Sequence, residues 1–247
     1  MLGSFIRRGA VAGLAGGAAS ALFLLLVGER TIGDAIRLEE KHGGGGQELY
    51  TRGTQVFGGA LGVILVSIAL GVLFAVTFAA VRHRLPGRND WQRSIIWAAT
   101  GFVVVYLVPF AKYPPNPPAV GNPDTIDERT ILYFAVLAWS IGAAYLAVRL
   151  GRWMRTRQYS DPARQSAVAG AWVVLVAVGF MVLPGTPDAV TAPATLIWRF
   201  RLASAGGALA LWAVTGAFFG LLSLAAAKRR AGVRREVTEV TGVTSES

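Results

Sequence analysis

Six long apolar runs, separated by polar segments, divide this chain of 247 residues. Each run approaches the roughly 20 residues that a helix needs to cross the hydrocarbon core of a bilayer. The runs predict helices at about residues 8–27, 56–81, 91–110, 131–150, 166–183 and 205–227. The fold class that follows is an all-α membrane protein, with one six-helix domain over residues 1–227 and a basic, disordered tail over residues 228–247.

The composition agrees with a membrane protein. Hydrophobic residues make up 53% of the chain and charged residues 15%, whereas a soluble domain carries about 25% charged residues. Mean hydropathy is +0.50. The chain contains no cysteine, which excludes disulfides, thiolate metal sites and a cysteine nucleophile.

The net charge of +10 comes largely from arginines that flank the apolar runs. They do not form a basic face with interleaved aromatic residues, so the charge argues for orientation in a lipid bilayer and against nucleic acid as a partner. The sequence lacks the glycine-rich motif that cradles nucleotide phosphates, and it shows no nucleophile–base pair. We therefore expect no enzyme and no permanently bound cofactor.

Lysine and arginine are unequally divided between alternate polar segments. Of the 24, 16 lie in the amino terminus, the second and fourth loops and the tail, and 8 lie in the first, third and fifth loops. With the acidic residues included, the two sides carry +11 and −1. The positive-inside rule predicts a multi-pass protein of the cell membrane with both termini in the cytoplasm. The first, third and fifth loops would then face outward.

The third loop, residues 112–130, contains five prolines and is called the proline loop below. Each proline lacks a backbone N–H and fixes φ, so this segment cannot be a helix interior, and it is stiffer than a Gly- and Ser-rich linker. Two interpretations stay open: a rigid outer cap held by ion pairs, and a vestibule for a substrate. The residues that would structure the loop or line the vestibule are Lys112, Tyr113, Asn116, Asn122 and Arg129, with Arg199 and Arg201 from the start of the sixth helix.

Small residues predict where helices touch. Glycine recurs at Gly9, Gly13 and Gly17 on the first helix, and residues 58, 59 and 62 of the second are also glycines. Such spacing lets backbones approach closely in lipid. Packing within the bundle is the favoured interpretation, with a homo-oligomer interface as the alternative. Sequence similarities between the hairpins are compatible with three parallel in–out–in hairpins, or with chance.

The first loop, residues 28–55, holds the densest set of potential metal ligands. Glu39 and His42 are spaced i and i+3 on a short predicted helix and would project from one face. This is the spacing of the Glu-x-x-His ligand pair in carboxylate metal proteins, and imidazole with carboxylate suits cobalt, nickel or zinc. Asp124 in the proline loop is the third candidate ligand. The alternative for the first loop is a solvated acidic helix with an incidental histidine.

Four segments of this chain resemble the CbtA family of proposed cobalt transporter subunits. They are PFAKYPPNPPAVGNPDTIDERTILYF at residues 109–134, GERTIGDAIRLEEKH at 28–42, TRGTQVFGG at 51–59 and LIWRFRLASAGG at 196–207. The resemblance implies cobalt(II) as the transported ion. It also implies a CbtB-like partner, a small single-helix membrane subunit with a histidine-rich segment.

The interiors of the six predicted helices contain no Asp, Glu or Lys. Ionisable residues inside the membrane usually mark ion pathways, so any ligands for an ion would lie in the loops or be backbone and hydroxyl oxygens. The leading hypothesis is a membrane subunit that takes up cobalt together with its small partner. The rival is a structural or assembly subunit with no permeation path of its own.

Overall fold

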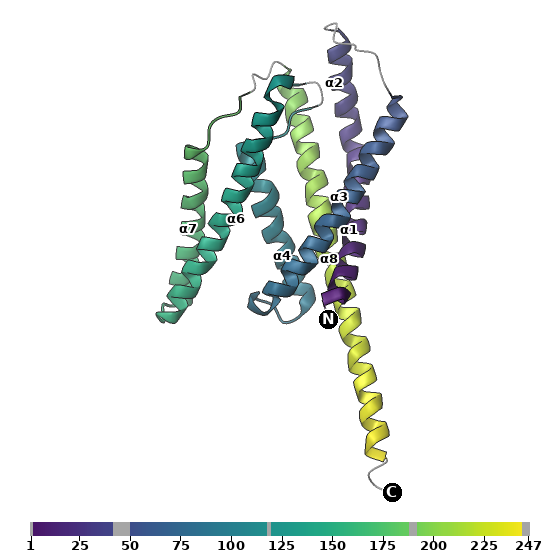
Figure 1. Cartoon of the computed structure of the whole chain (residues 1–247), viewed down its shortest axis with the longest axis vertical. Coiled ribbons are helices and arrows are strands. Elements are labelled where there is room, and N and C mark those ends of the chain that lie inside the picture. Colours follow the sequence, from purple (N-terminus) through teal and green to yellow (C-terminus); the bar gives the residue numbers. More distant parts are fainter. Residues whose placement is uncertain (1, 42–49, 118–119, 188–191, 244–247) are drawn as a thin grey trace. The chain divides into compact units, whose positions relative to one another are not determined.

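The computed structural model of the chain describes residues 2–41, 50–117, 120–187 and 192–243, and these residues form helices and loops without any strand (Figure 1). Short π and 3-10 segments lie between or beside the longer helices: η1 (Leu24–Gly28), η2 (Arg82–Arg84), η3 (Phe102–Leu107) and η4 (Pro123–Thr125). The α-helices are α1 (Leu2–Phe23), α2 (Glu29–Lys41), α3 (Arg52–Val81), α4 (Asp90–Gly101), α5 (Val108–Lys112), α6 (Ile126–Thr156), α7 (Asp161–Val182) and α8 (Ala194–Val243).

Six helical stretches are long and apolar enough to cross a membrane, which confirms the predicted fold class. The in–out–in arrangement of three hairpins stays a prediction. Helix α8 continues to Val243, beyond the span that ends at Arg229 and into the segment predicted as a tail. The spans are Leu2–Arg37, Arg52–Arg84, Asp90–Lys112, Ile126–Thr156, Asp161–Val182 and Ala194–Arg229.

The chain forms two compact units. Unit 1 comprises Met1–Leu25, Leu49–Thr100 and Gly206–Ser247. Unit 2 comprises Leu26–Glu48 and Gly101–Ala205. Unit 2 contains the described part of the proline loop.

In unit 1, α1 and α3 pack antiparallel through glycines. A Cβ atom on Gly13 would contact the Ser67 carbonyl oxygen and lie 3.0 Å from the Gly71 Cα atom, and a Cβ on Gly9 would contact the Gly71 carbonyl oxygen. A backbone approach this close requires residues without side chains. The predicted contact of the first helix is thus present, and its partner is Gly71, which the sequence analysis did not single out.

The predicted contact of the second helix is absent from the described structure. Residues 58, 59 and 62 have no heavy atom within 4 Å of the position that a Cβ would take. Clustered glycines therefore mark a helix contact on α1, whereas those of α3 meet no other described residue. The homo-oligomer alternative stays a prediction.

An aromatic cluster closes unit 1 near the start of α1. Phe78 and Phe219 are fully buried, and their ring centroids lie 5.1 Å apart at an interplanar angle of 74°, the edge-to-face geometry that aromatic pairs prefer. Phe5 and Phe74 pack against the same pair. On α4, the buried Ser94 hydroxyl donates to the Gly216 carbonyl oxygen of α8 at 2.9 Å.

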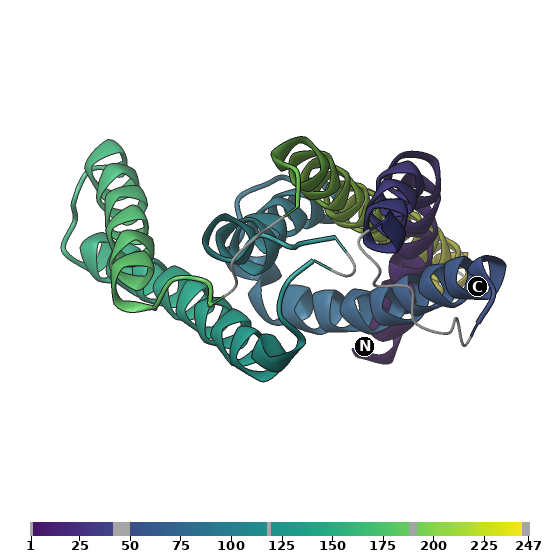
Figure 2. The same cartoon turned by 90° about the horizontal axis from the view of Figure 1, so that it is seen from above.

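In unit 2, α6 and α7 form a helical hairpin and run side by side in both views (Figure 1 and Figure 2). The Trp139 indole on α6 donates to the Leu175 carbonyl oxygen on α7 at 2.7 Å. Gly179 makes room for the same ring, because a Cβ there would contact its Cδ1 and Nε1 atoms. The hairpin therefore depends on one aromatic side chain that both packs and donates a hydrogen bond.

The third span passes through Pro109 and continues to Lys112, two residues beyond the predicted end of the helix at residue 110. Segment η3 is a π-helix, in which the Val108 N–H donates to the Val103 carbonyl oxygen, five residues back. In this pattern residue 109 would donate to the Val104 carbonyl oxygen, and proline cannot. The buried Ser140 hydroxyl of α6 donates to that oxygen instead, at 2.7 Å. A neighbouring helix thus supplies the hydrogen bond that the proline removes.

Replacing Ser140 with alanine is expected to lower the free energy of unfolding by about 1–3 kcal/mol, because it leaves the buried Val104 carbonyl oxygen without this donor. Thermal unfolding of the purified protein in detergent measures the effect. Thr100→Ala is the matched control, since the exposed Thr100 hydroxyl bonds only within its own helix, to Ile96. Equal stability of the two variants would show that Ser140 does not support the Pro109 region.

Candidate functional site

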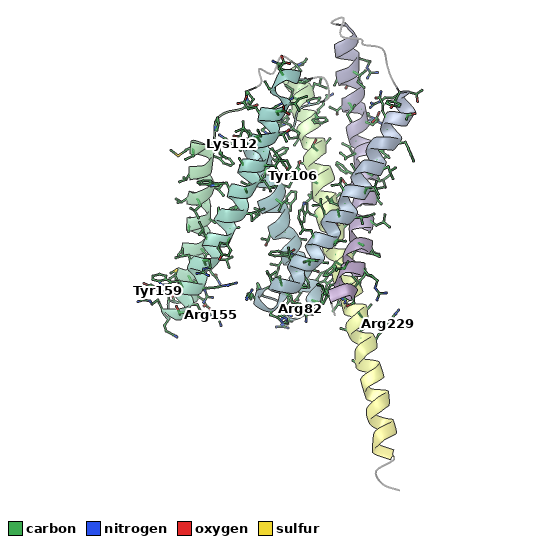
Figure 3. The ribbon with its side chains drawn as sticks, in the orientation of Figure 1. Arg82, Tyr106, Lys112, Arg155, Tyr159 and Arg229 are labelled. Atoms are coloured by element: carbon green, nitrogen blue, oxygen red, sulfur yellow. The ribbon has the colours of Figure 1, made fainter. Side chains whose placement is uncertain are left out.

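The proline loop begins at a cation that caps another helix. The Lys112 ammonium, at the end of α5, donates to the Phe180 and Leu183 carbonyl oxygens at 2.8 and 2.9 Å. Figure 3 shows where Lys112 lies. These oxygens lie in the last turn of α7 and at its C-cap, where backbone carbonyls lack helical partners and the helix dipole favours positive charge. Lys112 therefore joins the ends of the third and fifth spans.

Tyr113 makes the next connection. Its hydroxyl donates to the Pro184 carbonyl oxygen at 2.7 Å, just after α7. Burial raises the pKa of the Tyr113 hydroxyl above its ordinary value of 10.0, so the group stays protonated and able to donate at neutral pH. Lys112 and Tyr113 together attach the beginning of the proline loop to the segment that follows α7.

Arg201 holds the middle of the loop from α8. Its Nε atom donates to the Pro115 carbonyl oxygen at 3.3 Å, and its Nη2 atom donates to the Asn116 Oδ1 atom at 3.0 Å. The rigid fork of a guanidinium group suits this two-point contact. Because the prolines restrict the backbone on both sides of Asn116, few contacts are needed to define the path of this stretch.

Asn122 stabilises the turn at the end of the proline loop. Its Oδ1 atom accepts from the Asp124 N–H at 3.0 Å, and its carbonyl oxygen accepts from the Thr125 hydroxyl at 2.8 Å. Gly121 precedes it at φ 118°, a conformation that favours glycine. Thr125 occupies the N-cap position of α6, and its side chain makes no cap hydrogen bond there.

These segments surround a cavity of about 410 Å³, called the proline-loop cavity below. It lies wholly within unit 2. Tyr113, Asn116, Arg129 and Arg201, which the sequence analysis assigned to a loop or vestibule, are among the residues that line it. The others are Pro114, Pro115, Ile126, Thr130, Leu132, Tyr133, Thr186 and Pro187.

The lining of the proline-loop cavity is cationic and rich in hydrogen-bond donors. Arg129 and Arg201 both contribute to it, and its described lining contains no carboxylate. Two guanidinium groups with tyrosine, threonine and asparagine side chains suit the oxygens of an anion such as a carboxylate. The described lining offers a bare divalent cation no carboxylate or imidazole ligand.

The structure places the candidate metal ligands apart from this cavity. Asp124 is exposed in η4 and does not line the cavity. Glu39 lies in α2, with its side chain outside the described residues, and His42 lies outside them altogether. Among the described residues, no group of three or more histidine or carboxylate side chains is placed to hold a metal ion. The roles proposed for Glu39, His42 and Asp124 stay predictions.

Two further differences concern which residues line the proline-loop cavity. Arg199 is exposed on α8 and does not line the cavity, although Arg201 does. Ile126, Thr130 and Tyr133 line it and were not singled out from sequence. Together with Arg129 they occupy positions i, i+3, i+4 and i+7, which lie along one face of α6. Helical periodicity could therefore have identified them, given a helix that begins at Ile126.

Six membrane-length helices and a structured connection between the third and fourth define a multi-pass α-helical membrane protein. A family model described as "Probable cobalt transporter subunit (CbtA)" matches residues 2–223. The chain belongs to the CbtA family, as the four sequence segments indicated. No curated protein and no solved structure matches it.

Proposed function

We propose that this chain is the membrane subunit of a cobalt-uptake system in the cell membrane, and that it acts with a CbtB-like single-helix subunit carrying a histidine-rich segment. The family match over residues 2–223 carries the proposal, because it connects nearly the whole chain with cobalt transport as one subunit of a system. The six membrane-length helices supply a scaffold of the required kind. The proposal assigns the chain no catalytic activity of its own.

The charge distribution supports an orientation with both termini in the cytoplasm. The arginine-rich segments at the start of α1, around η2, between α6 and α7 and in the second half of α8 would share one side of the membrane. The proline loop and the first loop would share the other side. Cobalt would then meet the first loop and the proline loop before it meets the membrane interior.

The character of the proline-loop cavity limits where cobalt would bind. Because the described lining of the cavity contains no carboxylate or imidazole, the proposal assigns metal capture to positions outside it. Those positions are Glu39 and His42 in the first loop and Asp124 in the proline loop. The remaining ligands would come from the imidazoles of the partner subunit, since nitrogen ligands suit cobalt.

Cobalt accumulation in cells that lack other cobalt uptake tests this function. We expect accumulation when the chain is produced with its partner, and a several-fold reduction for His42→Ala and for Asp124→Ala. Asp127→Ala is the matched control, since it removes an exposed carboxylate three residues from Asp124. Accumulation in none of the combinations would refute cobalt uptake, whereas full accumulation by both variants would refute only these ligands.

A non-conducting assembly subunit is the second candidate. The predicted helix interiors contain no Asp, Glu or Lys, and such residues usually mark ion pathways through a membrane. This candidate requires that the partner alone carries cobalt and that the present chain only raises the amount of partner in the membrane. Uptake normalised to the quantity of membrane-inserted partner distinguishes the two functions.

A further inference from the structure

A second cavity lies at one end of unit 1, between the first turns of α1 and the part of α8 that ends its span. It has a volume of about 400 Å³ and is called the arginine groove below. The spacing of its lining residues places them on one face of each helix. Helix α1 contributes Ser4, Arg7, Arg8 and Val11, and α8 contributes Leu222, Ala225, Ala226 and Arg229.

The lining of the arginine groove has two chemical halves. Three guanidinium groups and one hydroxyl form the polar half, and the described lining contains no carboxylate. Val11, Leu222 and the two alanines form the apolar half. A ligand that satisfies both halves must carry a negative charge next to a hydrocarbon part.

Arg8 is the fixed element of the polar half. Its Nη1 atom donates to the Ser223 hydroxyl at 3.0 Å, which joins α1 to α8, and its Nε atom donates to the Ser4 carbonyl oxygen at 2.9 Å. The guanidinium group also lies 4.6 Å from the centroid of the Phe5 ring, within range of a cation–π interaction. Arg8 therefore keeps its charge in place whether or not a ligand is bound.

Arg7 and Arg229 differ from Arg8, because both side chains are exposed and neither contacts a described residue through a hydrogen bond or ion pair (Figure 3 shows Arg229 at the end of the α8 span). They lie on different helices and line the same groove. Their donors are thus available to an anion that sits between the two helices, and guanidinium groups match phosphate oxygens in geometry.

The position of the groove identifies the source of the anion. It lies at the first residues of the span Leu2–Arg37 and at the last residues of the span Ala194–Arg229, where the headgroup region of a bilayer is expected. Toward the middle of the spans, the exposed surface continues with apolar residues such as Leu14 and Leu221. Cations at the headgroup level with apolar side chains below them match a phospholipid.

We propose that the arginine groove binds one anionic glycerophospholipid of the phosphatidylglycerol type. Its phosphate contacts Arg7 and Arg229 beside the fixed Arg8, and an acyl chain follows Val11 and Leu222. A zwitterionic lipid fits less well, because its ammonium group meets three guanidinium charges. Inorganic phosphate fits only the polar half and leaves the apolar half in water.

Lipid titration of the purified full-length protein, followed by native mass spectrometry, tests this site. The probes are phosphatidylglycerol and phosphatidylcholine with identical acyl chains. We expect one phosphatidylglycerol to bind with an affinity at least about tenfold higher than phosphatidylcholine, and Arg7→Gln with Arg229→Gln to remove this preference. The double variant should fold normally, since neither side chain makes a hydrogen bond or ion pair with a described residue, and an unchanged melting temperature without lipid verifies this.

Arg149→Gln with Arg152→Gln is the matched control, since it removes two exposed arginines near the end of α6, in unit 2. Equal affinity for the two lipids, or an equal loss in both double variants, would refute a specific site and leave only general attraction to headgroups. A competition arm adds inorganic phosphate. Displacement by phosphate at concentrations similar to those of the lipid would identify a phosphate site and refute a lipid site.

Discussion

Replacing Gly13 with alanine is expected to lower the free energy of unfolding by about 1–3 kcal/mol, and with leucine by more, because the new side chain would overlap the backbone of α3. A Cβ on residue 13 would contact the Ser67 carbonyl oxygen and lie 3.0 Å from the Cα atoms of Gly71 and Ile68. Backbone atoms of a helix cannot move aside as a side chain does. The helices would have to separate along their whole contact.

The melting temperature in detergent measures this effect, with an expected decrease of roughly 2–12 °C for Gly13→Ala. Gly62→Ala is the matched control on α3, since a Cβ there meets no atom within 4 Å. This variant should be unchanged or slightly more stable, because alanine favours a helix over glycine by up to about 1 kcal/mol. A stable Gly13→Ala together with an unstable Gly62→Ala would contradict the α1–α3 contact and favour an interface at residues 58–62.

The six spans could be predicted because lipid imposes a simple condition on sequence. A chain crossing the hydrocarbon core must satisfy its backbone hydrogen bonds internally, so length and hydropathy identify the helices. The helix ends follow different physics. Helix α6 begins at Ile126 and includes Asp127, Glu128 and Arg129 in its first turns, since a helix does not stop where its residues become polar. Hydropathy therefore located the spans and left the helix ends short.

Pro109 shows a second limit of local reasoning. Proline lacks the N–H that a helix interior requires, and the predicted helix ends at residue 110, directly after it. The missing donor is replaced by Ser140, which lies on another helix, and the π-helical segment sets which carbonyl oxygen needs it. No feature of residues 100–112 indicates that Ser140 supplies this hydrogen bond. The longer helix matters for the site, because the two residues beyond the predicted end at residue 110 bring Lys112 to the end of α7.

Within the candidate site, residue types were easier to foresee than partners. Arginines and polar residues near helix ends are visible in the sequence, and this pattern predicted Arg201 and Asn116 as residues of the loop or vestibule. Their contact joins positions 85 residues apart and has no periodic signal. The same applies to the arginine groove, whose two faces lie at opposite ends of the chain.

Replacing Lys112 with methionine is expected to destabilise the α6–α7 hairpin by about 2–3 kcal/mol, because the Phe180 and Leu183 carbonyl oxygens lose a charged donor. Among the described residues of α7, Gly179 is the one that is buried, so this helix has little packing to hold it in place. Lipid tails are as apolar as helix surfaces, and burial of apolar area does not drive helices together in a membrane. The polar bonds from Trp139 and Lys112 must therefore supply much of the attachment.

Hydrogen exchange resolved to the last turn of α7 is the sharper measurement, since it reports local opening as well as global stability. Lys112→Met should raise exchange at residues 179–183 and at Gly185 and Thr186 while leaving α1 and α3 unchanged. Lys112→Gln, which keeps a donor without the charge, should lie between methionine and the wild type. Lys228→Met, at an exposed position on α8, is the control for loss of a lysine charge. If exchange in α7 were the same in all three variants, Lys112 would not cap this helix, and the start of the proline loop would be held through Tyr113 and Arg201 instead.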